Sequence, residues 1–190
     1  MTERMRTIIL SLVVFWMTPA FPAINLSKID GADALKDAEV HINTEGTKGL
    51  VVVFLSAKCP CSDSHIAELK SLSKEYSEFR FVAVNSNTDE TNELSQEYFN
   101  RVKLEFPVVK DKNLEIADRY KAFKTPHAFV ISADGQILYQ GGVSSSRQFA
   151  TADRKFLREA LANLHDGKTV ATPESRTLGC VITRGEKNVW

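Results

Sequence analysis

Continuous apolar runs alternate with amphipathic stretches along the first half of this chain. Residues 50–55, LVVVFL, contain no polar position, as expected of a central strand covered on both faces. Residues 60–76 instead carry apolar side chains at helical spacing with charged ones between them, which predicts an amphipathic helix. A second buried strand at 79–87 and a polar helix at 89–103 follow. This alternation is typical of a sheet with parallel strands.

The second half of the chain departs from this alternation, because two strand-like segments follow each other without a helix between them. Only ADG at residues 133–135 separates them, and this tight-turn sequence predicts a hairpin. The alternation of strands and helices over both halves predicts the α/β class. The elements expected here are a strand at 106–111, a helix at 114–123, strands at 128–132 and 136–142, and a helix at 153–164 that ends near Gly167.

Length and composition fit one domain of ordinary size. The chain has 190 residues, of which 43% are hydrophobic and 25% charged, so it can bury a core without a disulfide scaffold. Basic and acidic residues are equal at 24 each, so no broad field attracts nucleic acid. We expect one domain at 24–167. The tail at 168–190 has no clear periodicity, and we interpret it as a surface segment able to fold back.

The first twenty residues differ from the rest of the chain. Arg4 and Arg6 precede the apolar stretch IILSLVVFWM, and small residues follow at Ala20 and Ala23. This pattern predicts a secretory signal peptide at 1–20, with Ala23 as the other candidate cut site. The apolar stretch is shorter than the roughly 20 residues that span a bilayer, so we expect cleavage and no stable membrane insertion. The expected location is periplasmic in a Gram-negative bacterium, and otherwise secreted.

Cysteine is the residue type that carries the candidate chemistry. Three cysteines in an exported chain leave at least one thiol free or paired outside the chain. If Pro60 takes the first helical position, Cys59 becomes the N-cap residue, with its sulfur near the free N–H groups of the first turn. Those groups and the helix dipole lower the pKa of a thiol, so Cys59 is the candidate nucleophile. Lys58 would add a favourable charge.

The partner of Cys59 is open between two thiols. At 100° per residue, Cys61 lies about 200° around the helix from Cys59 and should point away, while Ser62 takes the place of the second cysteine of a C-x-x-C motif. A disulfide between Cys59 and Cys61 is within reach of the chain, but it would unwind the first turn. Cys180 in the tail is the other candidate, and we favour it as the resolving thiol.

Several motifs resemble the redoxin domain of the thioredoxin superfamily, in the group related to alkyl hydroperoxide reductase and thiol-specific antioxidant proteins. They are FLSAKCPCSDSHIAEL, FPVVKD, TPHAF, YQGG and LGCVI, within residues 45–182. The resemblance implies a three-layer sandwich, with helices on both faces of a mixed central sheet. It also implies that Cys59 is the attacking cysteine and Cys180 the late one. A cis peptide bond between Thr125 and Pro126 would let the Thr125 backbone pair with an extended substrate.

Departures from the family's motifs leave its two main activities open. Thioredoxins carry a tryptophan where this chain has Lys58. Peroxidase members carry P-x-x-x-T/S-x-x-C, in which Ser56 fits the hydroxyl position but Val52 replaces the proline. We therefore predict a thiol-disulfide oxidoreductase without cofactors. It would act on protein thiols or disulfides and exchange electrons with a membrane or periplasmic thiol reductant. The alternative is a peroxiredoxin-like thiol peroxidase with antioxidant activity.

A metal site is the remaining alternative. His65 follows Cys61 by four residues, so the two would share a helix face and could hold copper or zinc. Two ligands are too few for a structural zinc site, so Cys59, Cys180 or His127 would have to contribute. We favour the plainer interpretation that His65 is an exposed helix residue and that no metal is bound.

Overall fold

The computed structural model describes residues 25–36 and 38–185, so the predicted signal peptide lies outside the described residues. Seven strands form one sheet in the order β2-β1-β5-β4-β3-β7-β8. They are β1 (Lys28–Asp33), β2 (Glu39–Asn43), β3 (Gly49–Phe54), β4 (Phe79–Asn85), β5 (Val108–Lys110), β7 (His127–Ser132) and β8 (Ile137–Gly141). A separate pair joins β6 (Lys124–Thr125) to β9 (Cys180–Val181).

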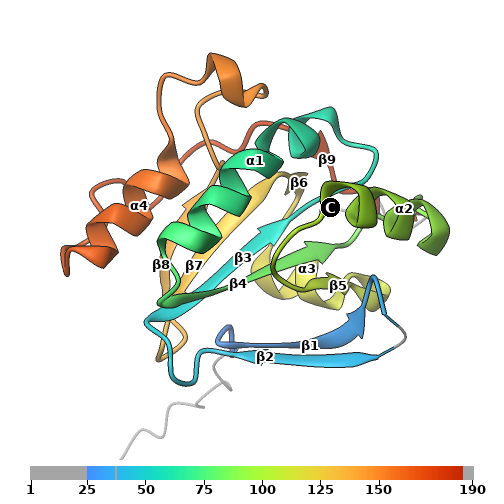
Figure 1. The fold of residues 1–190 in the computed structure, drawn as a ribbon, viewed down its shortest axis with the longest axis horizontal. Helices are drawn as coiled ribbons and strands as arrows, with labels where there is room; N and C mark the ends of the chain where they lie inside the picture. Colours follow the sequence, from blue (N-terminus) through green and yellow to red (C-terminus); the bar gives the residue numbers. More distant parts are fainter. Residues whose placement is uncertain (1–24, 37, 186–190) are drawn as a thin grey trace, which may run out of the picture.

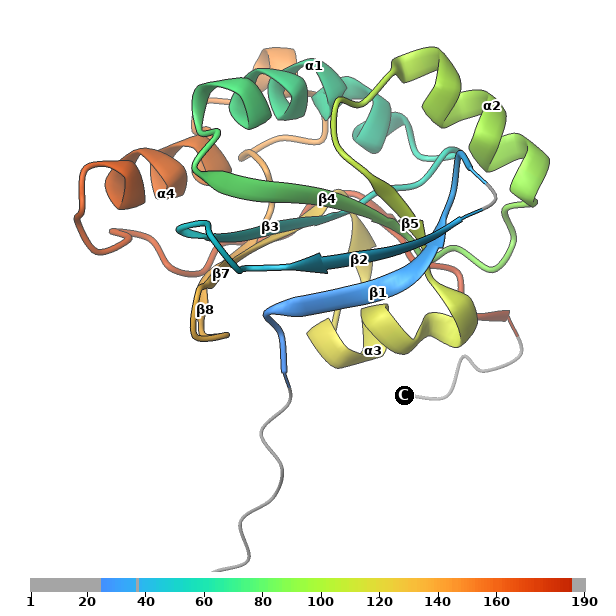
Figure 2. The same ribbon diagram turned by 60° about the horizontal axis from the view of Figure 1, so that its bottom comes forward.

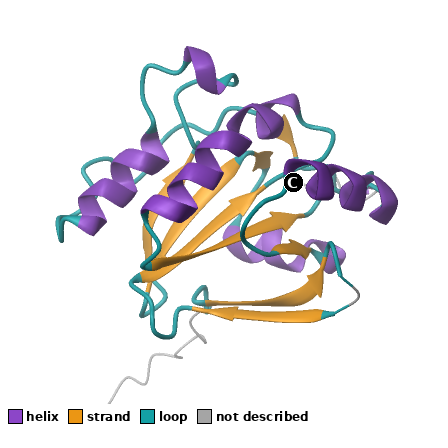
Figure 3. Cartoon of the chain, viewed as in Figure 1, coloured by secondary structure: helices purple, strands orange, loops and turns teal. Residues whose placement is uncertain are grey.

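Helices cover both faces of the sheet. Figure 2 shows α1, α2 and α4 above it and α3 below it, and the cartoon in Figure 3 shows the strands as the layer between them. The helices are α1 (Pro60–Glu75), α2 (Asn92–Val102), α3 (Glu115–Tyr120) and α4 (Phe156–His165), with short 3-10 turns η1 (Lys112–Leu114) and η2 (Phe149–Thr151). This three-layer α/β arrangement confirms the predicted class, and it is a thioredoxin-like fold.

The sheet is mixed, and β3 lies inside it between β4 and β7. Strand β3 runs parallel to β4 and antiparallel to β7, so Val52 lies opposite Val82 on one side and Phe129 on the other. Alternate β3 side chains enter different cores: Val53 packs in the core under α1, and Phe54 in the core above α3. Every β3 residue is buried, which explains why this strand has no polar position.

Two parts of the fold go beyond the elements expected from the sequence. Strands β1 and β2 form an antiparallel hairpin that extends the sheet past β5, where Ala32 lies opposite Lys110. The tail returns to the domain after α4, as expected, but the strand β9 that it forms with β6 was not predicted (Figure 1). Among the described residues, no helix is long and apolar enough to cross a membrane.

Candidate thiol site

Helix α1 begins at Pro60, directly after Cys59, as the sequence predicts. Pro60 takes the first helical position, and Cys59 is the N-cap residue with extended backbone angles, φ −94° and ψ 110°. Its carbonyl oxygen accepts the first helical hydrogen bond from the Asp63 N–H at 3.1 Å. Cys59 is only 2% exposed. Its sulfur therefore lies in a buried position at the positive end of a helix dipole.

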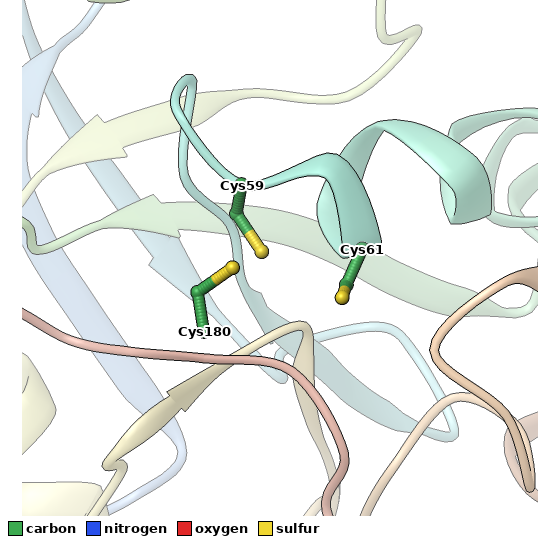
Figure 4. Close-up of side chains that lie close together, drawn as sticks. All are labelled: Cys59, Cys61 and Cys180. Atoms are coloured by element: carbon green, nitrogen blue, oxygen red, sulfur yellow. The ribbon is translucent and has the colours of Figure 1, made fainter.

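The sulfur atoms of Cys59, Cys61 and Cys180 form one cluster. They all lie within 4.8 Å of one another, and all three cysteines are free thiols. Figure 4 shows the Cys59 and Cys180 sulfurs facing each other, with the Cys61 sulfur beside them. The prediction that Cys61 points away is wrong. The step of 100° per residue holds only between helical residues, and the extended backbone of Cys59 swings its side chain onto the side that Cys61 occupies.

Cys180 reaches this cluster through the pair β6–β9, in which it lies opposite Thr125. The peptide bond between Thr125 and Pro126 is cis, as expected. The Cys59 thiol donates a hydrogen bond to the Thr125 carbonyl oxygen at 3.1 Å. Gly179 permits the close approach of the two strands, because a Cβ there would lie 2.0 Å from that same oxygen. The Thr125 backbone thus contacts both the candidate nucleophile and the tail.

The three thiols differ in acidity. Burial raises the pKa of Cys59. Hydrogen bonds from the Cys180 thiol, from the Thr125 side chain and from the N–H groups of Ser62 and Cys180 outweigh burial and lower the pKa to about 7. Burial and the interaction with Cys59 raise the pKa of Cys180 to about 12, and they also raise that of Cys61. At neutral pH, therefore, one sulfur of the cluster carries most of the negative charge.

A buried carboxylate that sequence reasoning missed holds the loop before Cys59. Glu90, 5% exposed, accepts hydrogen bonds from the N–H groups of Ala57 at 3.0 Å and Lys58 at 3.3 Å. It also accepts from the Ser56 hydroxyl and from the Asn85 amide. Glu90 follows β4, whose carboxyl end lies beside that of β3. A carboxylate directly after the second of two predicted parallel strands was the sequence feature that could have indicated this role.

The residues predicted to support Cys59 do so in different ways. The Ser62 hydroxyl accepts a hydrogen bond from the Ser56 N–H at 3.2 Å, which ties the first turn of α1 to the preceding loop. The Ser56 hydroxyl is bound to Glu90. The ammonium group of Lys58 pairs with the Asp89 carboxylate at 3.0 Å, so a carboxylate already balances the charge expected to act on Cys59.

His65 is buried, so its interpretation as an exposed residue is wrong. Its Nδ1 donates to the Cys61 carbonyl oxygen at 2.7 Å, and its Nε2 is hydrogen-bonded to the Ser144 hydroxyl at 2.8 Å. The loop after β8 supplies Ser144, which covers this face of the helix, and burial lowers the pKa of the imidazole. Both ring nitrogens have partners within the protein, so the metal pair Cys61 and His65 is not formed.

The other proposed ligand is also apart from the sulfurs. His127 lies between the rings of Phe123 and Phe129, on the α3 side of the sheet. Within the described ranges, the group of residues whose geometry could hold a metal ion is the three cysteines alone. Thiolates suit soft ions such as Cu(I) or zinc.

The fold and the cysteine cluster define a thioredoxin-like thiol protein. The family model described as Redoxin matches residues 19–156, and the chain belongs to this family. A curated relative, thiol-disulfide oxidoreductase ResA of Halalkalibacterium halodurans, is 31% identical over 114 residues, which cover 58% of this chain and 64% of the relative. The match therefore spans less than two thirds of that relative's length.

Two further comparisons give the same picture. Thiol-disulfide oxidoreductase ResA of Oceanobacillus iheyensis is 25% identical over 136 residues, covering 70% of each chain. The crystal structure of an uncharacterized conserved protein from Geobacillus kaustophilus superimposes with a TM-score of 0.74 at 23% identity, covering 84% of this chain and 89% of that one. The structural match extends the shared fold over most of the described residues.

Proposed function

We propose that this protein is a thiol-disulfide oxidoreductase in which Cys59 is the nucleophile. The observation that carries the proposal is the cluster of three sulfurs, of which only Cys59 has a lowered pKa. A thiolate attacks a disulfide far faster than a thiol does, and two further thiols lie within reach to complete the exchange. The names of the two curated relatives support the same activity.

The reaction proceeds in two exchanges. The Cys59 thiolate attacks one sulfur of a substrate disulfide, forming a mixed disulfide and releasing the other substrate sulfur as a thiol. Cys180 then attacks the Cys59 sulfur, releases the substrate and leaves a disulfide between Cys59 and Cys180. A dithiol reductant outside this chain reduces that bond and restores both thiols. Cys61 is the alternative resolving thiol, because its sulfur lies in the same cluster.

We further propose that the protein works outside the cytoplasm. The predicted signal peptide at 1–20 supports export, and disulfide substrates persist in oxidising compartments. The substrates would be protein thiols or disulfides, and the reductant a membrane or periplasmic thiol protein. Fractionation of cells that produce the full chain, with mass determination of the processed amino terminus, tests this part. An unprocessed chain confined to the cytoplasm would contradict it.

The exchange itself is tested with a fluorescent peptide disulfide and dithiothreitol as reductant. We expect Cys59→Ser to lower kcat/KM by at least about a thousandfold, because the hydroxyl is not ionised at neutral pH. The control is Ser71→Ala, on the same helix and outside the thiol cluster, with circular dichroism to establish that each variant is folded. Retention of full activity by folded Cys59→Ser would overturn the proposal.

Peptide mapping of the oxidised protein separates the two resolving thiols. After treatment with diamide and blocking of free thiols, we expect a peptide pair joined through Cys59 and Cys180. A bond between Cys59 and Cys61 in most molecules would instead assign the resolving role to Cys61.

A further inference from the structure

Residues 178–182, which we call the cover segment, fill a strand edge beside Cys59. In the antiparallel pair β6–β9, Cys180 lies opposite Thr125. An extended peptide that formed backbone hydrogen bonds with Thr125 would need this same edge. With the segment in place, Cys59 is 2% exposed. A polypeptide disulfide therefore reaches Cys59 only after the cover segment has moved away.

Each position of the cover segment has distinct surroundings. At Gly179, an added Cβ would lie 2.0 Å from the Thr125 carbonyl oxygen, so a side chain does not fit. Val181 is 63% exposed, so most of its side chain lies in solvent. Ile182 is 1% exposed, packs in the core on the α3 side of the sheet, and donates its N–H to the Phe123 carbonyl oxygen at 3.0 Å. Along this edge, four consecutive positions therefore hold a residue without a side chain, a cysteine, an exposed residue and a buried aliphatic residue.

From this geometry we propose that the cover segment holds the place of the substrate and has the sequence pattern that a substrate needs. The substrate is an extended polypeptide with a disulfide-bonded cysteine in the register of Cys180. A glycine precedes that cysteine, where Gly179 now lies, and a branched aliphatic residue follows two positions after it, where Ile182 now lies. This inference rests on the proposed exchange at Cys59 and names the substrate class for it.

The substrate and the cover segment compete for the same strand edge, so the return of the cover segment both brings Cys180 to the mixed disulfide and displaces the substrate. The substrate occupies the edge while Cys59 attacks its cysteine sulfur, and the substrate's other sulfur leaves as a thiolate and takes a proton from solvent. The cover segment then returns, and Cys180 attacks the Cys59 sulfur. The proton of Cys180 passes to the departing substrate sulfur. Two electrons have reduced the substrate disulfide, the disulfide between Cys59 and Cys180 remains, and an external dithiol reduces it.

Alkylation of Cys59 measures whether the cover segment controls access. In a Cys61→Ser/Cys180→Ser background, Cys59 is the remaining thiol. Rates are compared on the high-pH plateau of each variant's own pH profile, where ionisation of Cys59 no longer limits them. We expect Gly179→Ala to raise the rate of reaction with iodoacetamide about tenfold, because the added methyl group forces the segment off β6. Val181→Ala is the matched control and should leave the rate unchanged, because that side chain is exposed. Equal rates for Gly179→Ala and its parent would overturn the proposal.

Three peptides test the sequence pattern with the wild-type protein. Each carries glutathione on its cysteine: LGCVI, LVCVI with the tight position filled, and LGCVD with the aliphatic residue replaced. We expect kcat/KM for glutathione release to fall about tenfold for each altered peptide, since one bulky or charged group must be accommodated in a closed contact. Equal kcat/KM for all three, with activity dependent on Cys59, would overturn the substrate pattern and leave the exchange standing. Equal activity of Cys59→Ser on LGCVI would overturn the exchange itself.

Discussion

The beginning of α1 and the cover segment build one site by different means. Helix α1 packs on the core through Leu69 and Leu72, which are fully buried, and Glu90 fixes the loop before it. The cover segment contributes a strand of two residues, with Val181 largely exposed. The helix side therefore gives a thiolate a fixed surrounding, while the tail side holds its thiol by a few backbone contacts and the buried Ile182 side chain. These differences suit the roles that we propose, with Cys59 as the nucleophile and Cys180 as the resolving thiol.

The contact between the two regions also shifts the pKa values of their thiols in opposite directions. The Cys180 thiol donates toward the Cys59 sulfur and helps to lower its pKa to about 7. The same contact and burial raise the pKa of Cys180 to about 12. The proton therefore stays on Cys180 and the negative charge on Cys59, which supports our proposal that Cys59 attacks first.

The largest expected effect distinguishes Cys180 from Cys61. We expect Cys180→Ser to lower turnover of a peptide disulfide roughly a hundredfold, because resolution loses a thiol held beside the mixed disulfide. Cys61→Ser should lower it less than about threefold, since Cys180 remains. Mass spectrometry of acid-quenched reactions should show the Cys59–substrate adduct accumulating in the first variant alone. The reverse pattern would mean that the local helix, and not the cover segment, completes the exchange.

Glu90→Gln tests how the helix side is held. The amide keeps the shape of the carboxylate, but its NH2 group cannot accept a hydrogen bond. The Ala57 or the Lys58 N–H therefore loses its acceptor, and we expect the free energy of unfolding to fall by about 2 kcal/mol. Asp89→Asn is the control, since its pair with Lys58 is exposed and should change stability by less than about 1 kcal/mol. Urea denaturation measures both. Equal losses would contradict a special role for the buried carboxylate.

The smallest expected effect concerns the influence of Cys180 on the pKa of Cys59. Because the pKa of Cys59 is lowered, its thiolate is present above about pH 7 and is lost as the pH falls below that value. We expect Cys180→Ala to raise the pKa of Cys59 and to slow its alkylation at pH 7 roughly fivefold, because the donor thiol is gone. Cys61→Ala is the control. An unchanged pH profile in Cys180→Ala would show that the helix alone lowers the pKa of Cys59.

The sequence predicted the features that depend on neighbouring residues and missed those that depend on distant parts of the chain. Pro60 and the apolar spacing after it predicted the start of α1 and the N-cap position of Cys59, because these depend on neighbouring residues. The direction of Cys61 was wrong because helical geometry was applied to a residue with an extended backbone. The position of Cys180 needed the pairing β6–β9, which joins distant parts of the chain.

Three other features depended on tertiary neighbours in the same way. Glu90 follows β4, and its partners belong to the loop after β3, so its role appears only when the two strands are placed side by side. His65 has a polar side chain on an amphipathic helix, and only the returning loop at Ser144 makes it a buried residue. The hairpin β1–β2 has mixed polar and apolar positions, and its register with β5 gives it a place in the sheet.

The attachment of the tail to β8 also bears on the solubility of the protein. Strand β8 is the last of the seven-stranded sheet, and Gln140 exchanges backbone hydrogen bonds with Pro173 and Ser175 there, at 2.9 and 3.1 Å. An uncovered edge strand invites pairing with another molecule and leads to aggregation. Because this attachment lies upstream of residues 178–182, the cover segment can leave Cys59 while the edge stays capped. Movement at the site therefore need not turn the sheet into a template for intermolecular pairing.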